Sequence, residues 1–499
     1  MKKIAHLILS LSLICIMIAP TANIQAGNID NATAKQVAAY FMAAQTGNKG
    51  ISSDNVKLVY EIPNALSHET ALYVFNTPGR SGFVVVAGSD CVNPIVAYST
   101  DGDFDPTDIA PAMQWWLNEQ VQVIAYAQNN DLNPTPDMQK AWDQLTKEEL
   151  PYFGVDSKAI TRLLNSKWNQ EPLYNKYCPD VDGVLCPVGC VATAMAQIIY
   201  FWKFPWVGKG TNTYNWNAQA LSADFAHTYY DYNLMVDALT ESSPEATINA
   251  VALLSYHCGI AVNMNYGVDG SGSNDDKALK AFRKFFKYDA NSMQLLERYN
   301  NSLYHNPNNT TTANSKDTAW VNRIAEEILA GRPVYYAGYS PEGGSVHAGH
   351  AFVCDGYNDV TKTLHFNWGW GGRGDCWCNV FNSNLNVPFM GLNFTQYHSA
   401  IVGLTPPADS LSNPIAVPTV EDPFTCSIYP NPANDHITIS YALTNGNSAE
   451  MQIFDITGRK VDEVTLSPYA SQTTIDVANY QPGIYFCRLN GISKKFVVQ

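Results

Sequence analysis

Past its first residues the sequence lacks any long hydrophobic run, and basic side chains are scarce. The chain of 499 residues carries 30 lysines and arginines against 45 aspartates and glutamates, which gives a formal net charge of -15. Such a charge repels polyanions at long range, so nucleic acid is not an expected partner. No later segment stays apolar for the roughly 20 residues that a bilayer requires, so no transmembrane segment is expected either.

Cysteine is also sparse. The sequence has 11 cysteines, and one of them, Cys15, lies in the N-terminal apolar stretch. This density is far below that of a small disulfide scaffold, so the fold must rest on hydrophobic cores. A hydrophobic content of 46% over this length is enough for about three domains with cores of their own.

The first 26 residues have the pattern of a secretory signal peptide. Lys2 and Lys3 precede an apolar stretch from Ile4 to Ile18, and small residues follow in TANIQAG. This order predicts cleavage after Ala26 and a mature protein outside the cytoplasm. The apolar stretch is too short for a membrane anchor.

Three further units follow the signal peptide. Residues 27–158 predict a small α+β domain that ends in a polar, exposed connector between residues 129 and 157. Residues 159–404 place helical patterns before strand patterns, which is the order of an α+β domain with an antiparallel sheet. A linker rich in Pro and Ser at 405–424 separates it from residues 425–499, where short strands alternate with turns as in a β-sandwich.

Cys190 stands directly before the helical pattern VATAMAQIIYFW. Four roles are open to it: zinc ligand with Cys186, disulfide partner of Cys178 or Cys186, buried thiol, or nucleophile. A zinc site needs further ligands at a matching distance, and the sequence supplies no such pair. A disulfide is sterically awkward for a residue that opens a helix. The dipole at a helix N-terminus stabilises a thiolate, which favours the nucleophile.

A thiolate nucleophile needs a base and a group that orients the base. His350 leads into a strand in HAGHAFVCDG, and Asn367 begins the turn after the next strand in HFNWGWGG. Two consecutive antiparallel strands would bring these residues side by side. We then expect the Asn367 amide to hold one imidazole nitrogen while the other nitrogen faces the thiol.

These segments resemble the signature blocks of the streptopain and interpain family of papain-like cysteine peptidases. LLNSKWNQEPLYN, YNWN, MNYGVDGSGS and RPVYYAGY also match, in the family's order. The resemblance implies a papain-like α+β fold with Cys190 as nucleophile and His350 as general base and acid. It further implies that Gln170 and the backbone N–H of Cys190 form the oxyanion hole. Asn367 and Trp368 would orient and shield the imidazole.

The same resemblance implies a substrate-binding rim at Gly272, Ser273 and Gly349. The segment YGVDGSGS is one residue longer than the usual loop, so the position of Ser273 in the rim is the loosest of these matches. No metal and no cofactor is implied.

The flanking units resemble segments that accompany such an enzyme. Residues 27–158 are similar to the streptopain propeptide, notably in GFVVVAGSDCVNPIVAYSTDGDFD, which implies an inhibitory domain that is removed by a cut near Lys158. Residues 425–499 resemble the sorting domain of the type IX secretion system. That likeness implies a Gram-negative bacterium, the secretion machinery as a partner, and release or attachment at the cell surface.

The sequence therefore predicts a secreted cysteine endopeptidase that is made as a zymogen and hydrolyses peptide bonds through a Cys190 thioester. Its expected partners are protein segments and its own propeptide, and the family resemblance implies a preference for an apolar side chain two residues before the cut. One alternative is a non-catalytic surface binding protein on a papain-like scaffold, and another is an acyl transferase of transglutaminase type. Intact Cys190, His350, Gln170 and Asn367 argue against the binding protein.

Overall fold

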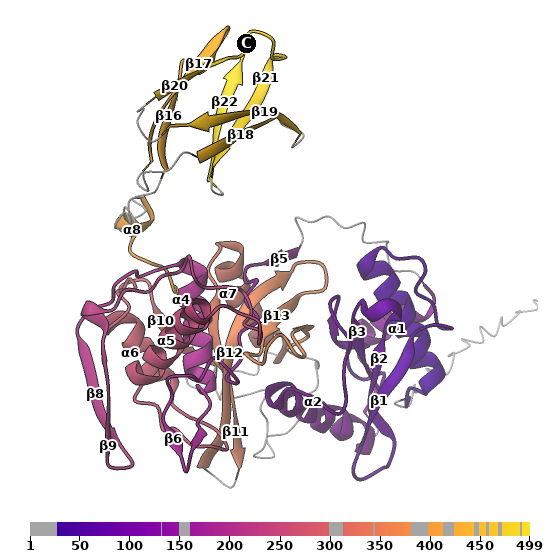
Figure 1. Cartoon of the computed structure of the whole chain (residues 1–499). Coiled ribbons are helices and arrows are strands. Elements are labelled where there is room, and N and C mark those ends of the chain that lie inside the picture. The colour runs from indigo at the N-terminus through magenta and orange to yellow at the C-terminus, as the bar shows by residue number, and fades with distance from the viewer. Residues whose placement is uncertain are drawn as a thin grey trace, which may run out of the picture. The chain divides into compact units, whose positions relative to one another are not determined.

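The chain folds into two units, with the boundary in the sequence between Pro407 and Ala408, and each unit is described by itself (Figure 1). No helix in the described part of the chain is long and apolar enough to cross a membrane. The structure is a computed structural model, and it describes residues 27–130, 132–148, 160–298, 313–342, 345–380, 398–412, 424–443, 449–455, 459–467, 472–489 and 492–499.

The N-terminal domain of the first unit places helices against an antiparallel sheet. The helix α1 begins after Asp30, whose carboxylate accepts the Thr33 N–H, and it ends at Gly47 in the left-handed conformation. Its buried residues recur three and four apart, as the sequence pattern predicts. The elements of this domain are α1 (Asn31–Thr46), β1 (Lys57–Pro63), β2 (Thr70–Asn76), β3 (Phe83–Ala87), β4 (Ile95–Ser99), α2 (Pro111–Asn129) and α3 (Pro136–Thr146).

Helix α3 corrects the expectation of an exposed connector between residues 129 and 157. Its residues Met138, Trp142 and Leu145 are buried, and they stand four and three positions apart on one face. A narrow apolar stripe among polar residues is enough to dock a helix when a core lies beside it. The polar composition of this segment concealed the stripe.

The second domain has the predicted order of helices first and sheet second. Helix α4 begins at Cys190, and its buried side chains pack against α5 in an apolar core. The principal elements are β5 (Ile160–Arg162), α4 (Cys190–Trp202), α5 (Glu245–Ala261), α6 (Asp275–Lys284), β10 (Gln294–Glu297), α7 (Ala313–Leu329), β11 (Val334–Glu342), β12 (Ser345–Asn358), β13 (Thr363–Asn367), β14 (Cys376–Cys378) and β15 (His398–Val402). Two short hairpins complete it: β6 (Asp180–Val181) with β7 (Val184–Leu185), and β8 (Thr211–Trp216) with β9 (Gln219–Asp224).

One sheet of 11 strands runs through both domains, in the order β1-β2-β3-β4-β14-β13-β12-β11-β15-β10, with β5 paired to β12. The domains join where β4 pairs antiparallel with β14, so that Tyr98 lies opposite Trp377 and Ala97 opposite Cys378. The Asn379 N–H extends the ladder with a bond of 2.9 Å to the Val96 carbonyl. The N-terminal domain therefore covers a sheet edge that the second domain would otherwise expose.

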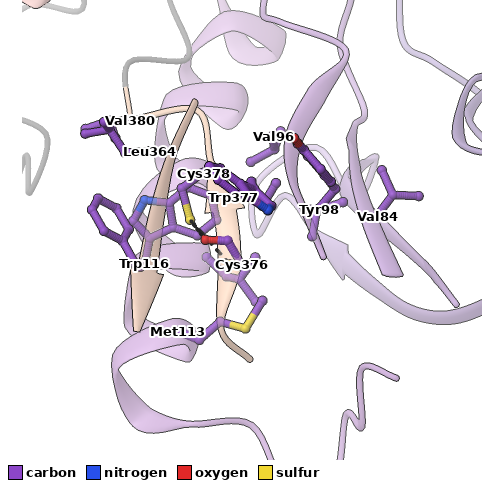
Figure 2. Close-up of a cluster of buried hydrophobic side chains, with 14 of the residues drawn as sticks. Val84, Val96, Tyr98, Met113, Trp116, Leu364, Cys376, Trp377, Cys378 and Val380 are labelled. Atoms are coloured by element: carbon purple, nitrogen blue, oxygen red, sulfur yellow. Dashed lines mark hydrogen bonds between the residues drawn. The ribbon is translucent and has the colours of Figure 1, made fainter. Parts of the chain in front are cut away.

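Apolar side chains fill the junction between β4 and β14 (Figure 2). The rings of Tyr98 and Trp377 are stacked with their centroids 6.3 Å apart. The Tyr98 hydroxyl accepts a hydrogen bond of 2.8 Å from the Asn358 side chain. The labelled members of the cluster are Val84, Val96, Tyr98, Met113 and Trp116 of the N-terminal domain and Leu364, Cys376, Trp377, Cys378 and Val380 of the second domain.

The sheet separates two hydrophobic cores. Side chains of a strand alternate between its faces, and β11 and β12 follow this rule. One core holds Tyr336 and Phe352, whereas the other core, which contains the buried face of α4, holds Ala337 and Val353. This alternation decides which side chains can reach the site described below.

The second unit is the predicted β-sandwich. Two antiparallel sheets enclose a core of their own, in which Ile439 of one sheet and Ile453 of the other are fully buried. Short helix α8 (Ala408–Ser412) precedes them. The sheets are β16 (Phe424–Tyr429), β17 (His436–Leu443) and β20 (Gln472–Asp476), and β18 (Ala449–Asp455), β19 (Lys460–Leu466), β21 (Gly483–Leu489) and β22 (Ile492–Val498).

Candidate active site

Cys190 is the first residue of α4, directly after a glycine that the local packing requires. Gly189 has φ of 89°, and a Cβ on it would lie 2.8 Å from Met264 Cε and 2.9 Å from the Ser271 carbonyl oxygen. The Ser271 hydroxyl donates a hydrogen bond of 2.7 Å to the Pro187 carbonyl. The loop before α6 thus packs tightly against the turn that presents the thiol.

The Cys190 thiol meets His350, which lies on β12. The two side chains share a hydrogen bond, and the backbone N–H groups of Ala351 and Val191 also point at the sulfur. Both residues are half-buried. The structure therefore brings together the predicted nucleophile and the predicted base, although they come from opposite ends of the domain.

The two groups shift each other's ionisation. Burial is the largest influence on each and opposes its charge, but the charge of the partner and their mutual hydrogen bond outweigh it. The pKa of the Cys190 thiol is consequently lowered, and the pKa of the His350 imidazole is raised. These directions favour a thiolate and imidazolium pair over two neutral groups.

A backbone carbonyl orients the imidazole. His350 Nε2 lies 2.9 Å from the Trp368 carbonyl oxygen. Because a carbonyl only accepts, Nε2 carries the hydrogen and Nδ1 is left to face the thiol. The rings of Phe352 and Trp370 lie nearly parallel to the imidazole, with centroids 6.0 Å and 6.4 Å from it.

The expectation that the Asn367 amide holds the imidazole is wrong. Asn367 lies opposite Val353 in the β12–β13 register, so its side chain shares the face of Val353 and not that of His350. There it donates 2.6 Å to the Ser166 carbonyl and pairs with Gln197. Three residues further along the turn, the ring of Trp370 flanks the imidazole instead.

Trp368 was expected to shield the imidazole with its ring. The ring is buried and packs on Phe352 at 4.7 Å, and its Nε1 donates 2.7 Å to the Gly374 carbonyl. The main contribution of Trp368 to the site is therefore its backbone carbonyl. Trp370 is the indole that flanks His350, and the sequence signal for it was present in the repeated Trp of FNWGWGG.

Gln170 lies beside the segment that leads to Cys190. It is buried, with 5% of its surface exposed, and its carbonyl accepts a hydrogen bond of 3.1 Å from the Val188 N–H. Only Gly189 separates Val188 from Cys190, so this hydrogen bond holds the Gln170 backbone against the turn that carries the nucleophile. This placement is compatible with the expected oxyanion role.

The expected substrate rim is divided among three environments. Gly272 is exposed and exchanges two backbone hydrogen bonds with Asn265, of 2.9 Å and 3.0 Å. The Ser273 hydroxyl donates 2.8 Å to the Val262 carbonyl and so serves the loop itself. Gly349 is exposed and directly precedes His350. Gly272 therefore has both backbone groups engaged with Asn265, whereas Gly349 adjoins the imidazole along the chain.

The alternatives for Cys190 receive no support from its surroundings. Cys178, Cys186 and Cys190 are all free thiols, so no disulfide joins them. Within the described residues, no group of three or more His, Cys, Asp or Glu side chains could hold a metal ion. His365 Nδ1 donates a hydrogen bond of 2.6 Å to the Asp355 carboxylate, and both residues are buried.

Gln197 is a buried residue at this site that the sequence reasoning missed. It is fully buried on α4, and its side chain bonds to Asn367 and to the Ser166 hydroxyl. A signal for it existed. Gln197 stands seven residues after Cys190, on the same face two turns along, and it is the most polar residue of an otherwise apolar helix.

Comparison with known proteins agrees with this geometry. Residues 168–378 match the Peptidase C10 family, residues 26–124 match the Spi protease inhibitor family, and residues 427–499 match the secretion system C-terminal sorting domain. The thiol protease/hemagglutinin PrtT of Porphyromonas gingivalis is 26% identical over 429 residues, which cover 84% of this chain and 46% of PrtT. The chain thus spans less than half the length of that relative.

Two further relatives cover most of their own length. Streptopain of Streptococcus pyogenes is 27% identical over 399 residues, which cover 74% of this chain and 88% of streptopain. A fragment of prointerpain A of Prevotella intermedia, solved as a cysteine-to-alanine mutant, superposes with a TM-score of 0.55 at 28% identity, over 71% of this chain and 99% of that one. The papain-like α+β fold with a prodomain is thereby confirmed. The chain thus contains a peptidase domain of the C10, or streptopain, family of cysteine peptidases, with an inhibitor-type prodomain before it and a secretion sorting domain after it.

Proposed function

We propose that this chain is the zymogen of a secreted cysteine endopeptidase in which Cys190 is the nucleophile and His350 the general base and acid. The observation that carries the proposal is the contact between the thiol at the start of α4 and an imidazole whose other nitrogen is held by the Trp368 carbonyl. The lowered pKa of the thiol and the raised pKa of the imidazole supply a thiolate and a proton donor side by side.

In the first step the Cys190 sulfur forms a bond to the carbonyl carbon of a peptide, and negative charge moves to the carbonyl oxygen. As the first residue of α4, Cys190 has a backbone N–H without an acceptor inside the helix. That N–H and the Gln170 side chain form the proposed oxyanion hole, where each donor contributes about 3 kcal/mol to transition-state stabilisation. Gly272, Ser273 and Gly349 form the proposed rim for substrate backbone.

In the second step His350 gives its proton to the leaving amine, and the C–N bond breaks to leave a Cys190 thioester. Water then gives a proton to the neutral imidazole as it attacks the thioester. The carbon–sulfur bond breaks, the acid product leaves, and the thiolate and imidazolium return. The rings of Trp370 and Phe352, which lie nearly parallel to the imidazole, limit its rotation during this cycle.

The N-terminal domain acts as an inhibitor in this proposal. It is tied to both segments that border the site, because Asp101 pairs with Lys167 at 2.6 Å and Asp108 pairs with Arg373. We assign residues 27–158 to the propeptide and 159–404 to the peptidase domain. The expected cut near Lys158 lies outside the described residues. After 405–424, residues 425–499 direct export by type IX secretion, with release or attachment at the surface of a Gram-negative cell.

The test compares the full chain with its Cys190→Ala variant for self-cleavage and for casein digestion. A Cys186→Ala variant is the matched control, because Cys186 is a buried thiol four residues earlier. We expect Cys190→Ala to lose both activities and Cys186→Ala to keep them. Casein digestion by Cys190→Ala at the rate of the unmodified chain would refute the assignment.

A further inference from the structure

A buried amide network joins the helix that carries the nucleophile to the turn that holds the base. Gln197 Nε2 donates 3.0 Å to Asn367 Oδ1, and Asn367 Nδ2 lies 3.2 Å from Gln197 Oε1. Gln197 Oε1 also accepts 2.8 Å from the Ser166 hydroxyl. Gln197 and Asn367 are fully buried, and Ser166 is nearly so, which makes each of these bonds costly to lose.

The network ends on the peptide group that orients His350. Asn367 Oδ1 accepts 3.1 Å from the Gly369 N–H, which lies in the same rigid peptide plane as the Trp368 carbonyl. That carbonyl holds His350 Nε2 at 2.9 Å. One planar group is therefore fixed at its N–H end by Asn367 and presents its oxygen to the imidazole.

The turn also packs directly on α4. Gly369 has φ of 74°, and a Cβ on it would lie 3.1 Å from the Thr193 methyl group. Cys190, Thr193 and Gln197 follow one another at three and four residues along the same face of α4. This face carries the nucleophile at one end and the anchor of the turn at the other.

We propose that Gln197 is a positioning residue, which keeps the Trp368 carbonyl, and through it the His350 imidazole, in register with the Cys190 thiol. The inference rests on the proposed function of Cys190 and His350, and it adds a residue that touches neither the substrate nor the thiol. Without the Gln197 amide, the Asn367 side chain loses one hydrogen-bond donor and one hydrogen-bond acceptor. The peptide plane between Trp368 and Gly369, which Asn367 holds, then loses its fixed orientation.

The first variant is Gln197→Met, which keeps the length of the side chain and removes both hydrogen-bonding groups. We expect kcat on a casein-derived peptide to fall about 10- to 100-fold with KM changed less than about threefold, since ground-state binding is untouched. The pH at which iodoacetamide alkylation of Cys190 reaches half its maximal rate should rise, because a misplaced imidazolium stabilises the thiolate less.

Met195→Ala is the matched control. Met195 is buried on the same helix but belongs to the apolar core, so its removal opens a cavity without touching the network. Met195→Ala should lower the melting temperature and leave kcat and the alkylation profile close to those of the unmodified enzyme. An equal loss of kcat in Met195→Ala, or an unchanged alkylation profile in Gln197→Met, would overturn the proposal.

A second variant, Gln197→Glu, tests the proposal if Gln197→Met does not fold. A protonated carboxyl group can replace the amide as donor to Asn367 and acceptor from Ser166, whereas a carboxylate cannot donate. The ratio of its kcat to that of the unmodified enzyme should fall as the pH rises from 5 to 9, and a constant ratio would contradict the proposal. Loss of the proposed function itself gives a different result, namely full activity in Cys190→Ala.

Discussion

Replacing Asp375 by Asn should stabilise the first unit at neutral pH and leave its stability nearly unchanged in acid. Asp375 is 7% exposed, and one carboxylate oxygen accepts 3.0 Å from the Trp368 N–H. The other oxygen has no hydrogen-bond partner in the described part of the structure. Burial raises the pKa of Asp375 to about 6 and is partly opposed by His365.

The magnitude follows from that pKa. A rise from the ordinary value of 3.8 to about 6 is about two units, and each unit corresponds to about 1.4 kcal/mol. The folded state therefore binds the proton of Asp375 more tightly than the unfolded chain does. The contribution of this group to the free energy of unfolding is greatest below pH 4 and is lost as the pH rises through 6. Above pH 7 the charged carboxylate costs about 3 kcal/mol, which Asn removes while keeping an acceptor for the Trp368 N–H.

Neighbouring charged and titratable groups also shift the pKa of Asp375. His365 on β13 and Arg162 on β5 lower its pKa, and Asp355 on β12 raises it. Urea unfolding of the full chain, in a Cys190→Ala background that cannot cleave itself, measures the effect between pH 4 and pH 8. Exposed Asp276 on α6 provides the control substitution to Asn.

The expected result is a difference in unfolding free energy between Asp375→Asn and its parent that grows by about 3 kcal/mol from pH 4 to pH 7. Any constant effect of the substitution cancels, because only the change with pH is used. A constant difference across this range would refute the reasoning, as would the same pH dependence in Asp276→Asn.

Three further predictions concern the site and the domain junction. Gly189→Ala should lower casein digestion at least tenfold in the folded protein, because its Cβ would collide with the loop carrying Ser271; peptidase assays on the purified variant check this. Gln170→Ala should reduce kcat by about 10²- to 10³-fold with little change in KM, as steady-state kinetics will show. Trp377→Ala should lower the free energy of unfolding in urea by about 3–5 kcal/mol, because Trp377 is buried between the domains. Arg373→Ala should lower it by about 1 kcal/mol or less, because Arg373 forms an exposed ion pair.

Local patterns in the sequence were enough to predict several of the helices and strands, among them α4. The α4 segment is apolar over several turns, and a helix starts where Gly189 ends the preceding turn. The pairing of Cys190 with His350 could also be predicted, because Cys190 opens a helical pattern and His350 directly precedes an apolar strand pattern, although strand β12 itself begins earlier, at Ser345. Helix α3 was missed because three apolar residues among many polar ones do not change the composition of a segment.

Pairing between distant strands could not be predicted in the same way. No feature of Ile95–Ser99 or of Cys376–Cys378 indicates that these two strands pair with each other. The sheet that joins the two domains could therefore be seen only in the structure. The predicted role of Asn367 was wrong for a related reason. A difference of one residue in register exchanges the faces of a strand, and register depends on the whole sheet.

The site-resolved alkylation of the matured enzyme tests the central claim most directly. Iodoacetamide is applied at a series of pH values, each modified cysteine is identified by peptide mapping, and residual peptidase activity is measured in parallel. We expect Cys190 to react first, with a half-maximal rate at a pH below that of an ordinary thiol, and activity to disappear in step with its modification. Activity that survives complete modification of Cys190, or that is lost with another cysteine, would contradict the account.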